Sequence, residues 1–503
     1  MAVLAIDLGT TGCKAALFDG REMLSSAYRH YQYVSRQDGW ADQDADAVWE
    51  LISAVVKEAL ASSAGKPAVQ AISVSVQGDA IIPIDSKGTA LHPAILGMDT
   101  RSHQEAADLE GRFGRGQIYA ATGMPCEPLN AITKIFWLKR HCPDLGKRVW
   151  KYVHYEEFLL MKLAGIPALD YSMASRTMAF DPAKKQWVPW ILEFVGLTPS
   201  QLGNVSPSGV PIGIVLKSVA EEWGIDRGAL VVAGGHDQCM AAIGSGVIEG
   251  DLACYSMGTA EVISTCFATP QMTAAMLQSN YPCYSHAVKD FYFTISLNQS
   301  GGISLEWFQQ AILQAGLREE AGRQELYEAL IAGLQFQPSP VLFLPHLVGS
   351  GTPTCDHRSR GAFIGLSLKV GRADLFQAVV DAMAFEARLN LETLDHLKIP
   401  IAELRAVGGG ARSRKILELK ATALNRPIAT LKNPQAALLG TAMQAQTAIG
   451  IFKDLEEARQ ECVLIEETIE PRREALEAYN EAFLRFRQLY DTLKSFYHHW
   501  RGQ

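Results

Sequence analysis

The chain lacks several features that would place it outside ordinary enzymes. Its 46 Lys and Arg residues do not outnumber its 54 Asp and Glu residues, so the net charge is −8, which argues against a protein that coats nucleic acid or an anionic membrane. Nine cysteines, from Cys13 to Cys462, include no CxxC pair, so neither a disulfide framework nor a zinc site is indicated. No predominantly apolar run reaches the roughly 20 residues that span a bilayer. Asp7 ends the first apolar run too early for a secretory signal. We therefore expect a cytoplasmic protein.

What the chain does have is length and apolar content. Its 503 residues are 48% hydrophobic, enough for two or three cores. Short apolar runs such as 3–6 and 71–76 read as strands, whereas residues 46–60 carry apolar side chains at helical spacing. This alternation predicts an α/β fold with a mixed sheet.

Two short turns suggest that the chain consists of related halves. Gly9-Thr10 separates two strand-like runs near the start, and Gly258-Thr259 separates two more after residue 253. The sequence match between these regions is slight, so duplication is a hypothesis that rests on the two turns.

The first of these turns belongs to the run Asp7-Leu-Gly-Thr-Thr-Gly-Cys-Lys14. Glycines allow backbone N–H groups to approach phosphate oxygens, hydroxyls donate further hydrogen bonds, and an acid can hold magnesium through water. A Gly-Thr pair is also an ordinary hairpin turn. The run alone therefore does not establish a phosphate site.

A triple glycine, Gly408 to Gly410, leads from a strand-like run into a helical one at 415–424. Bare backbone in this context can lie against a base or ribose, with phosphates near a helix N-terminus. The spacing matches neither a P-loop nor GxGxxG. A flexible loop is the alternative explanation, although the position between strand and helix favours ligand contact.

Asp237 follows the apolar run 229–233 and precedes a helical run, so its carboxylate lies at a strand-to-helix junction. It can be a helix N-cap, whose ionised form the helix dipole favours. It can also be a general base, because phosphoryl transfer depends mainly on positioning and a weak base is sufficient. The residues alone leave both interpretations open.

Taken in order, these motifs resemble the FGGY family of carbohydrate kinases over nearly the whole chain. Further matching segments are Trp40 with Gln43-Asp44, Asp99-Thr-Arg101, Lys134 to Leu138, Asp170 to Ser175, Ser300-Gly301-Gly302 with Trp307, and Leu344 to Leu347. The resemblance implies two actin-like (ribonuclease-H-like) domains around a central cleft. It assigns sugar binding to residues 1–246 and nucleotide binding to residues 247–503.

The resemblance also implies an ATP-dependent, magnesium-dependent kinase in which Asp237 is the general base and Asp7 organises Mg²⁺. It implies ATP and phosphate contacts from Gly9, Thr10, Thr11, Lys14, Gly258, Thr259, Gly302, Gly409, Gly410 and Ser413. It implies substrate contacts from Gln77, Asp79, Asp99, Arg101, His236 and Asp237. A junction histidine such as His236 is as often a structural residue.

The substrate is expected to be a ketose, either a pentulose or a hexulose. Members that act on D-xylulose carry Gln-Met-His-Gly where this chain has Gln77-Gly-Asp79-Ala, and Gly97 replaces a usual tryptophan. An acid at position 79 is closer to the glycerol-kinase pattern, so a polyol kinase is the alternative. An actin-like ATPase without sugar phosphorylation is a third possibility. No nucleic-acid or membrane partner is expected, and a homodimer is a reasonable prior.

Overall fold

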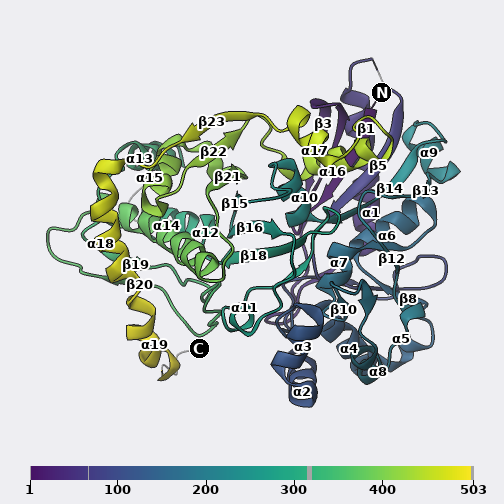
Figure 1. The fold of residues 1–503 in the computed structure, drawn as a ribbon, viewed down its shortest axis with the longest axis horizontal. Coiled ribbons are helices and arrows are strands. Elements are labelled where there is room, and N and C mark those ends of the chain that lie inside the picture. Colours follow the sequence, from purple (N-terminus) through teal and green to yellow (C-terminus); the bar gives the residue numbers. More distant parts are fainter. Residues whose placement is uncertain (1, 66, 314–319, 500–503) are drawn as a thin grey trace.

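The computed structural model describes residues 2–65, 67–313 and 320–499, which form two halves, each built on a mixed β-sheet (Figure 1). We call residues up to 246 the first half and those from 247 the second half. The first sheet has the order β13 (Pro211–Ile214), β14 (Leu230–His236), β5 (Val69–Val76), β1 (Ala2–Leu8), β2 (Gly12–Asp19) and β3 (Glu22–His30). The second has the order β17 (Tyr284–Ser285), β18 (Tyr292–Asn298), β16 (Glu261–Phe267), β15 (Leu252–Met257), β21 (Glu403–Val407), β22 (Ile428–Leu431) and β23 (Ile465–Ile469).

The two sheets share one connection pattern. In the first, β1 pairs antiparallel with β2 and parallel with β5; in the second, β15 pairs antiparallel with β16 and parallel with β21. Strands β3 and β18 extend the antiparallel side, and β14 and β22 the parallel side. The predicted fold class, two actin-like domains, is confirmed, and the Gly-Thr turns occupy equivalent hairpins.

Shorter strand pairs and helices surround the sheets. The pairs are β4 (Asp42–Gln43) with β7 (Ala94–Ile95), β6 (Ile82–Ile84) with β8 (Lys151–Val153), β9 (Ala168–Asp170) with β12 (Asn204–Ser206), β10 (Phe180–Asp181) with β11 (Gln186–Trp187), and β19 (Leu342–Leu344) with β20 (Ala362–Ile364). Helices of the first half are α1 (Ala45–Ser62), α2 (His103–Phe113), α3 (Arg115–Thr122), α4 (Ala131–His141), α5 (Pro143–Gly146), α6 (Tyr155–Ala164), α7 (Tyr171–Arg176), α8 (Pro189–Val195), α9 (Lys217–Trp223) and α10 (Asp237–Gly244). Those of the second half are α11 (Ala274–Gln278), α12 (Gly302–Phe308), α13 (Glu320–Ala332), α14 (Arg372–His396), α15 (Arg414–Leu424), α16 (Ala436–Ala448), α17 (Leu455–Cys462), α18 (Leu476–Phe486) and α19 (Leu489–His499).

Helix α1 shows how local sequence fixes an element. Asp44 caps it, because its side chain accepts a hydrogen bond from the backbone N–H of Ala47 at 3.0 Å. The predicted apolar face, including Val48, Ile52 and Val56, is buried and lies against β2 and β3. Among the residues that the structure describes, no helix combines the length and apolar character needed to cross a bilayer.

Helix α16 joins the halves. Although it follows β22 in the chain, it packs on β1, β5 and α10, and Figure 1 shows it, in yellow-green, beside the purple strands of the first half. A Cβ added at Gly244 of α10 would lie 1.9 Å from the carbonyl oxygen of Ala436, and one at Gly440 of α16 would lie 2.0 Å from that of Met240. The two helices therefore approach to a distance that only glycine permits on both sides.

We predict that Gly440→Ala lowers the free energy of unfolding by about 1–3 kcal/mol, because the added methyl forces α10 and α16 apart. Urea denaturation measures this. The control is Gly116→Ala in α3, where a Cβ meets no atom within 4 Å; it should be neutral or stabilising, as alanine is in exposed helix positions. Equal stabilities of the two variants would contradict the close crossing.

Candidate active site

Asp237 is the first residue of α10 and directly follows β14. Its side chain keeps 26% of its surface exposed. Burial raises the pKa of this carboxyl to about 7, and the nearby carboxylate of Asp7 adds to the shift, while hydrogen bonds from Gln238 and the charge of Arg176 oppose it. A carboxyl with this pKa changes protonation state near neutrality, which is the property of a general base.

The end of β14, just before Asp237, lies in close backbone contact with the neighbouring strand β5. A Cβ at Gly234 would lie 1.6 Å from the carbonyl oxygen of Val74, and the pairing of β14 with β5 shifts register between Val232 and Gly235. This irregularity bends the end of β14. The glycines that precede Asp237 are therefore needed to bring the strand to the helix.

His236 lies beside Asp237, with its Nε2 3.3 Å from Asp237 Oδ1. Burial, with the charge of Arg176, lowers the pKa of the imidazole well below its usual value, so the ring is neutral and the contact is not an ion pair. The Nδ1 atom lies 3.2 Å from the hydroxyl of Tyr284, and the backbone N–H donates to Ser172 Oγ at 3.0 Å. The structure thus brings His236 to Asp237, and residues of both halves hold its ring and backbone.

Asp7 is the second-last residue of β1, close to the first Gly-Thr turn. Ser75 Oγ donates to Asp7 Oδ1 at 2.8 Å. Burial raises the pKa of the Asp7 carboxyl, although Ser75 and Lys14 oppose the shift. Lys14 Nζ donates to Gln435 Oε1 at 3.0 Å. The lysine that the sequence predicts to contact phosphate is therefore hydrogen-bonded to the residue before α16.

Each of the two equivalent turns is closed by a hydrogen bond from the backbone N–H of its glycine. Gly9 N–H donates to the carbonyl of Gly12 at 3.0 Å, and Gly258 N–H donates to that of Ala260 at 3.0 Å. Thr11 and Thr259 are exposed at the turns. Both turns present hydroxyls and backbone to solvent, as a phosphate contact requires.

A cavity of about 330 Å³ brings together five of the predicted nucleotide residues, namely Gly258, Thr259, Gly302, Gly409 and Gly410. The N–H of Gly302 donates to the carbonyl of Gly258 at 2.9 Å. A Cβ added at Gly410 would lie 2.8 Å from the Cβ of Met257. The α12 N-terminus and the triple glycine therefore meet at the second turn. A pocket of this kind is the usual form of a small-molecule site.

The sequence analysis did not identify other residues that line this cavity, including Leu305, Glu306, Gln309 and Tyr327. They come from α12, the helical segment Gln309–Leu313 that follows it, and α13, and none of these four residues belongs to the motifs that the sequence showed. Ser413 does not line the cavity; its hydroxyl accepts from Ile416 N–H at 3.4 Å and caps α15.

On the predicted sugar side, Asp79 pairs with a residue that the sequence did not indicate. Its Oδ2 accepts hydrogen bonds from Arg176, from Nε at 3.1 Å and from Nη2. Asp79 Oδ1 and Gln77 Nε2 are buried without a hydrogen-bond partner among the described residues. A Cβ at Gly78 would lie 2.8 Å from His236 Nε2 and 3.3 Å from Arg176 Nε, so this glycine makes room for both side chains.

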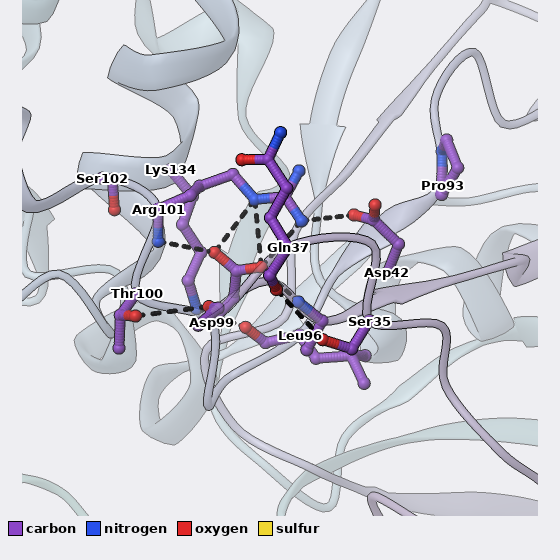
Figure 2. A network of polar contacts seen from close by, with 12 residues as sticks. Ser35, Gln37, Asp42, Pro93, Leu96, Asp99, Thr100, Arg101, Ser102 and Lys134 are labelled. Carbon is purple, nitrogen blue, oxygen red and sulfur yellow. Dashed lines mark hydrogen bonds and ion pairs between the residues drawn. The ribbon is translucent and has the colours of Figure 1, made fainter. Parts of the chain in front are cut away.

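Asp99 and Arg101 lie in a different environment (Figure 2). Both side chains are fully buried, and Arg101 Nη2 contacts Asp99 Oδ2 at 2.7 Å and Asp42 Oδ1 at 2.5 Å. The guanidinium lies 4.0 Å from the ring centre of Trp40 and 5.2 Å from that of Trp137. This geometry favours a scaffold role, and the substrate contact of both residues stays a prediction.

Lys134 connects this network to Asp79. Its fully buried ammonium donates to the carbonyl oxygens of Asp79 at 2.9 Å, Leu96 at 2.7 Å and Leu129 at 2.7 Å. Burial lowers the pKa of this lysine to about 7. The contacts fix the loop that carries Gln77 and Asp79.

The fold and this site define a two-domain sugar kinase, and comparisons with known proteins agree. The model of the FGGY family of carbohydrate kinases, N-terminal domain, matches residues 2–244, and that of the C-terminal domain matches residues 253–449. The chain belongs to the FGGY family of carbohydrate kinases, and it is a phosphotransferase with an alcohol group as acceptor.

Individual relatives span the whole chain. It is 28% identical over 501 residues to a xylulose kinase from Staphylococcus epidermidis, covering 98% of this chain and 97% of the relative. It is 27% identical over 468 residues to a glycerol kinase from Gloeobacter violaceus, covering 91% of this chain and 90% of the relative. The structure of ligand-bound xylulose kinase from Lactobacillus acidophilus matches with a TM-score of 0.90 at 24% identity over 99% of both chains.

We predict that Arg101→Met lowers the free energy of unfolding by about 3–5 kcal/mol, because it leaves the carboxylates of Asp42 and Asp99 buried without their partner. Urea denaturation provides the measurement. Arg227→Met is the control, since Arg227 pairs with Glu221 at the surface and should cost less than about 1 kcal/mol. A stable Arg101→Met protein with a raised sugar KM would instead place Arg101 at the substrate.

Proposed function

We propose that the protein transfers the γ-phosphate of ATP to a hydroxyl of a ketose, a pentulose or hexulose, with Asp237 as general base. The observation that carries this proposal is the Asp237 carboxyl at the start of α10, partly exposed and with a pKa of about 7. Below that pH the carboxyl is protonated, and above it the carboxylate can accept the proton of an attacking hydroxyl. The xylulose kinase relatives support a ketose as acceptor.

The residues around Asp237 fit a cation in the same region. The carboxylates of Asp7 and Asp237 raise the free energy of each other's ionised form, and a divalent cation would offset this repulsion. No cluster of three or more His, Cys, Asp or Glu side chains in the described chain is placed to hold a metal. Mg²⁺ would therefore use Asp7 with water and phosphate oxygens, neutralising charge that develops on the transferred group.

ATP would occupy the cavity beside Gly258 and Thr259, with Gly302, Gly409 and Gly410 against the nucleotide. Gly9, Thr10, Thr11 and Lys14 would contact the phosphates from the first half. Closure of the halves would exclude water and limit ATP hydrolysis. Under this proposal residues 1–246 bind sugar and residues 247–503 bind the nucleotide.

The sugar would meet one donor and one acceptor that the protein leaves unused, Gln77 Nε2 and Asp79 Oδ1. Arg176 neutralises Asp79 and holds its second oxygen, so the pair suits neutral hydroxyl groups. The acid at position 79 favours a second candidate, a polyol kinase of the glycerol type, and a glycerol kinase is among the relatives. A coupled ADP-release screen with ketoses and polyols separates the two substrate classes.

We predict that kcat/KM for the sugar rises about tenfold per pH unit below pH 7 and levels off above it, because the folded pKa of Asp237 is raised and only the ionised form accepts a proton.

Asp237→Asn should abolish phosphorylation and leave ATP binding, measured by calorimetry, within about twofold, since the base acts on the acceptor. A mutant with parental turnover would eliminate Asp237 as the base.

For the sugar pocket, Asp79→Asn and Arg176→Met should each raise the sugar KM at least about tenfold, the loss of a charged hydrogen bond, and change the ATP KM less than about twofold. Steady-state kinetics with either substrate varied makes the comparison. Arg227→Met serves as the surface control. Equal increases in both KM values would remove Asp79 and Arg176 from the sugar pocket.

A further inference from the structure

A second cavity, of about 200 Å³, lies where the halves meet. Tyr171, Lys185 and Ser208 line it from the first half, and the turn at 286–290, between β17 and β18, lines it from the second half. In Figure 1, α7 of the first half lies on the side that faces β18. None of the residues that line it also lines the nucleotide cavity.

His286 is an unusual residue in the wall of this cavity. It is 4% exposed, and its ring stacks on Phe293 with the ring centres 4.5 Å apart. Neither ring nitrogen makes a well-formed hydrogen bond to a described residue. Burial lowers the pKa of this imidazole to about 3, although the Val247 carbonyl offsets part of the shift. The neutral ring has one donor, for which the Val247 carbonyl is a nearby acceptor, and one acceptor nitrogen that is left without a partner among the described residues. A buried polar group without a partner costs about 1–3 kcal/mol.

The remaining polar groups of the wall are richer in donors than in acceptors. Lys185 Nζ lies 5.2 Å from the ring centre of Tyr171 and donates one hydrogen bond to Ser285 Oγ at 3.2 Å, so other protons of the ammonium remain for a ligand. Lys289 adds a second, exposed ammonium, whereas Asp290 is the one carboxylate among the residues that line the cavity. Among the residues that line the cavity, two ammonium groups therefore stand against one carboxylate, while the carboxylates of Asp170 and Asp181 act on Lys185 from outside the lining.

We propose that this cavity binds a small hydroxylated anion, a sugar phosphate or a sugar acid, at a site separate from the active site. The anionic group lies between Lys185 and Lys289, and hydroxyls satisfy His286. Ser208 donates its own proton to Asp170, with Oγ to Oδ2 at 2.5 Å, and so presents an acceptor to the ligand. A volume of about 200 Å³ is below the range of typical drug-sized sites and suits a small metabolite.

Hydrogen bonds connect this cavity to the base. Asp170 accepts from Ser208 and from Ser172 Oγ, the latter at 2.9 Å, and Ser172 Oγ in turn accepts from the backbone N–H of His236. A ligand that contacts Ser208 therefore acts on the residue next to Asp237. The effect on turnover, but not the binding itself, rests on the proposed role of Asp237.

Calorimetry tests the binding with ribose 5-phosphate, gluconate and neutral ribitol as probes, titrated into protein saturated with a non-hydrolysable ATP analogue. We expect at least one of the two anions to bind at one site per chain, and the tighter one identifies the anionic group. Lys289→Met should weaken that binding about tenfold or more. Lys184→Met, a neighbouring exposed lysine outside the cavity wall, should bind as the parent does. Absence of binding by both anions, ribitol binding that Lys289→Met weakens to the same degree, or unchanged anion affinity in Lys289→Met would overturn the proposal.

The same titration in Asp237→Asn separates this site from the proposed function. Binding that persists there, while phosphorylation is lost, supports both. If Asp237→Asn remains active but still binds the anion, the role of Asp237 fails and the cavity site stands. In the active protein, the bound anion should change kcat without competing with the sugar, and Lys289→Met should remove that effect. Purely competitive behaviour in both proteins would place the anion in the active site instead.

Discussion

The crossing of α10 and α16 is the contact on which the site depends. Gly244 and Gly440 allow the backbones to approach so closely that each helix contacts carbonyl groups of the other. Because α10 begins with Asp237, and α16 belongs by sequence to the second half but packs on β1 and β5, the crossing fixes the proposed base relative to the sheet that carries Asp7. The same helix begins one residue after Gln435, the hydrogen-bond partner of Lys14.

Near the crossing of α10 and α16, most charged groups of the site have a hydrogen-bond or ion-pair partner. Arg176 pairs with Asp79, Ser75 donates to Asp7, and burial keeps His236 neutral. Asp237 is left with an elevated pKa because it is buried near a second carboxylate. The protein's net charge of −8 does not describe this local balance of charges. Because the acidic groups of the site are paired or have a raised pKa, an acidic protein can still present groups suited to a phosphorylated ligand.

Much of this was predictable from the sequence. Regular periodicity identified α1 and the strands, and glycine-containing turns identified the hairpins at residues 9 and 258, because these features depend on local chemistry. Arg176 and Tyr284 were not identified, since each reaches the site through contacts between residues far apart in the chain. Asp99 and Arg101 show the opposite limit: a recognisable motif does not reveal that its side chains form a buried ion-pair network, and their contact with substrate stays a prediction. Ser413 likewise caps a helix rather than lining the cavity.

The most direct test of this account is the pKa of the Asp237 carboxyl, measured by carbon NMR titration of labelled aspartate, with Asp237→Asn to assign the signal. The structure predicts a value of about 7 in the parent protein and a lower value in Asp7→Asn, where the repulsive carboxylate is absent. A value near 4, the ordinary range of aspartate, in both proteins would contradict the placement of Asp237 as a half-buried base beside Asp7.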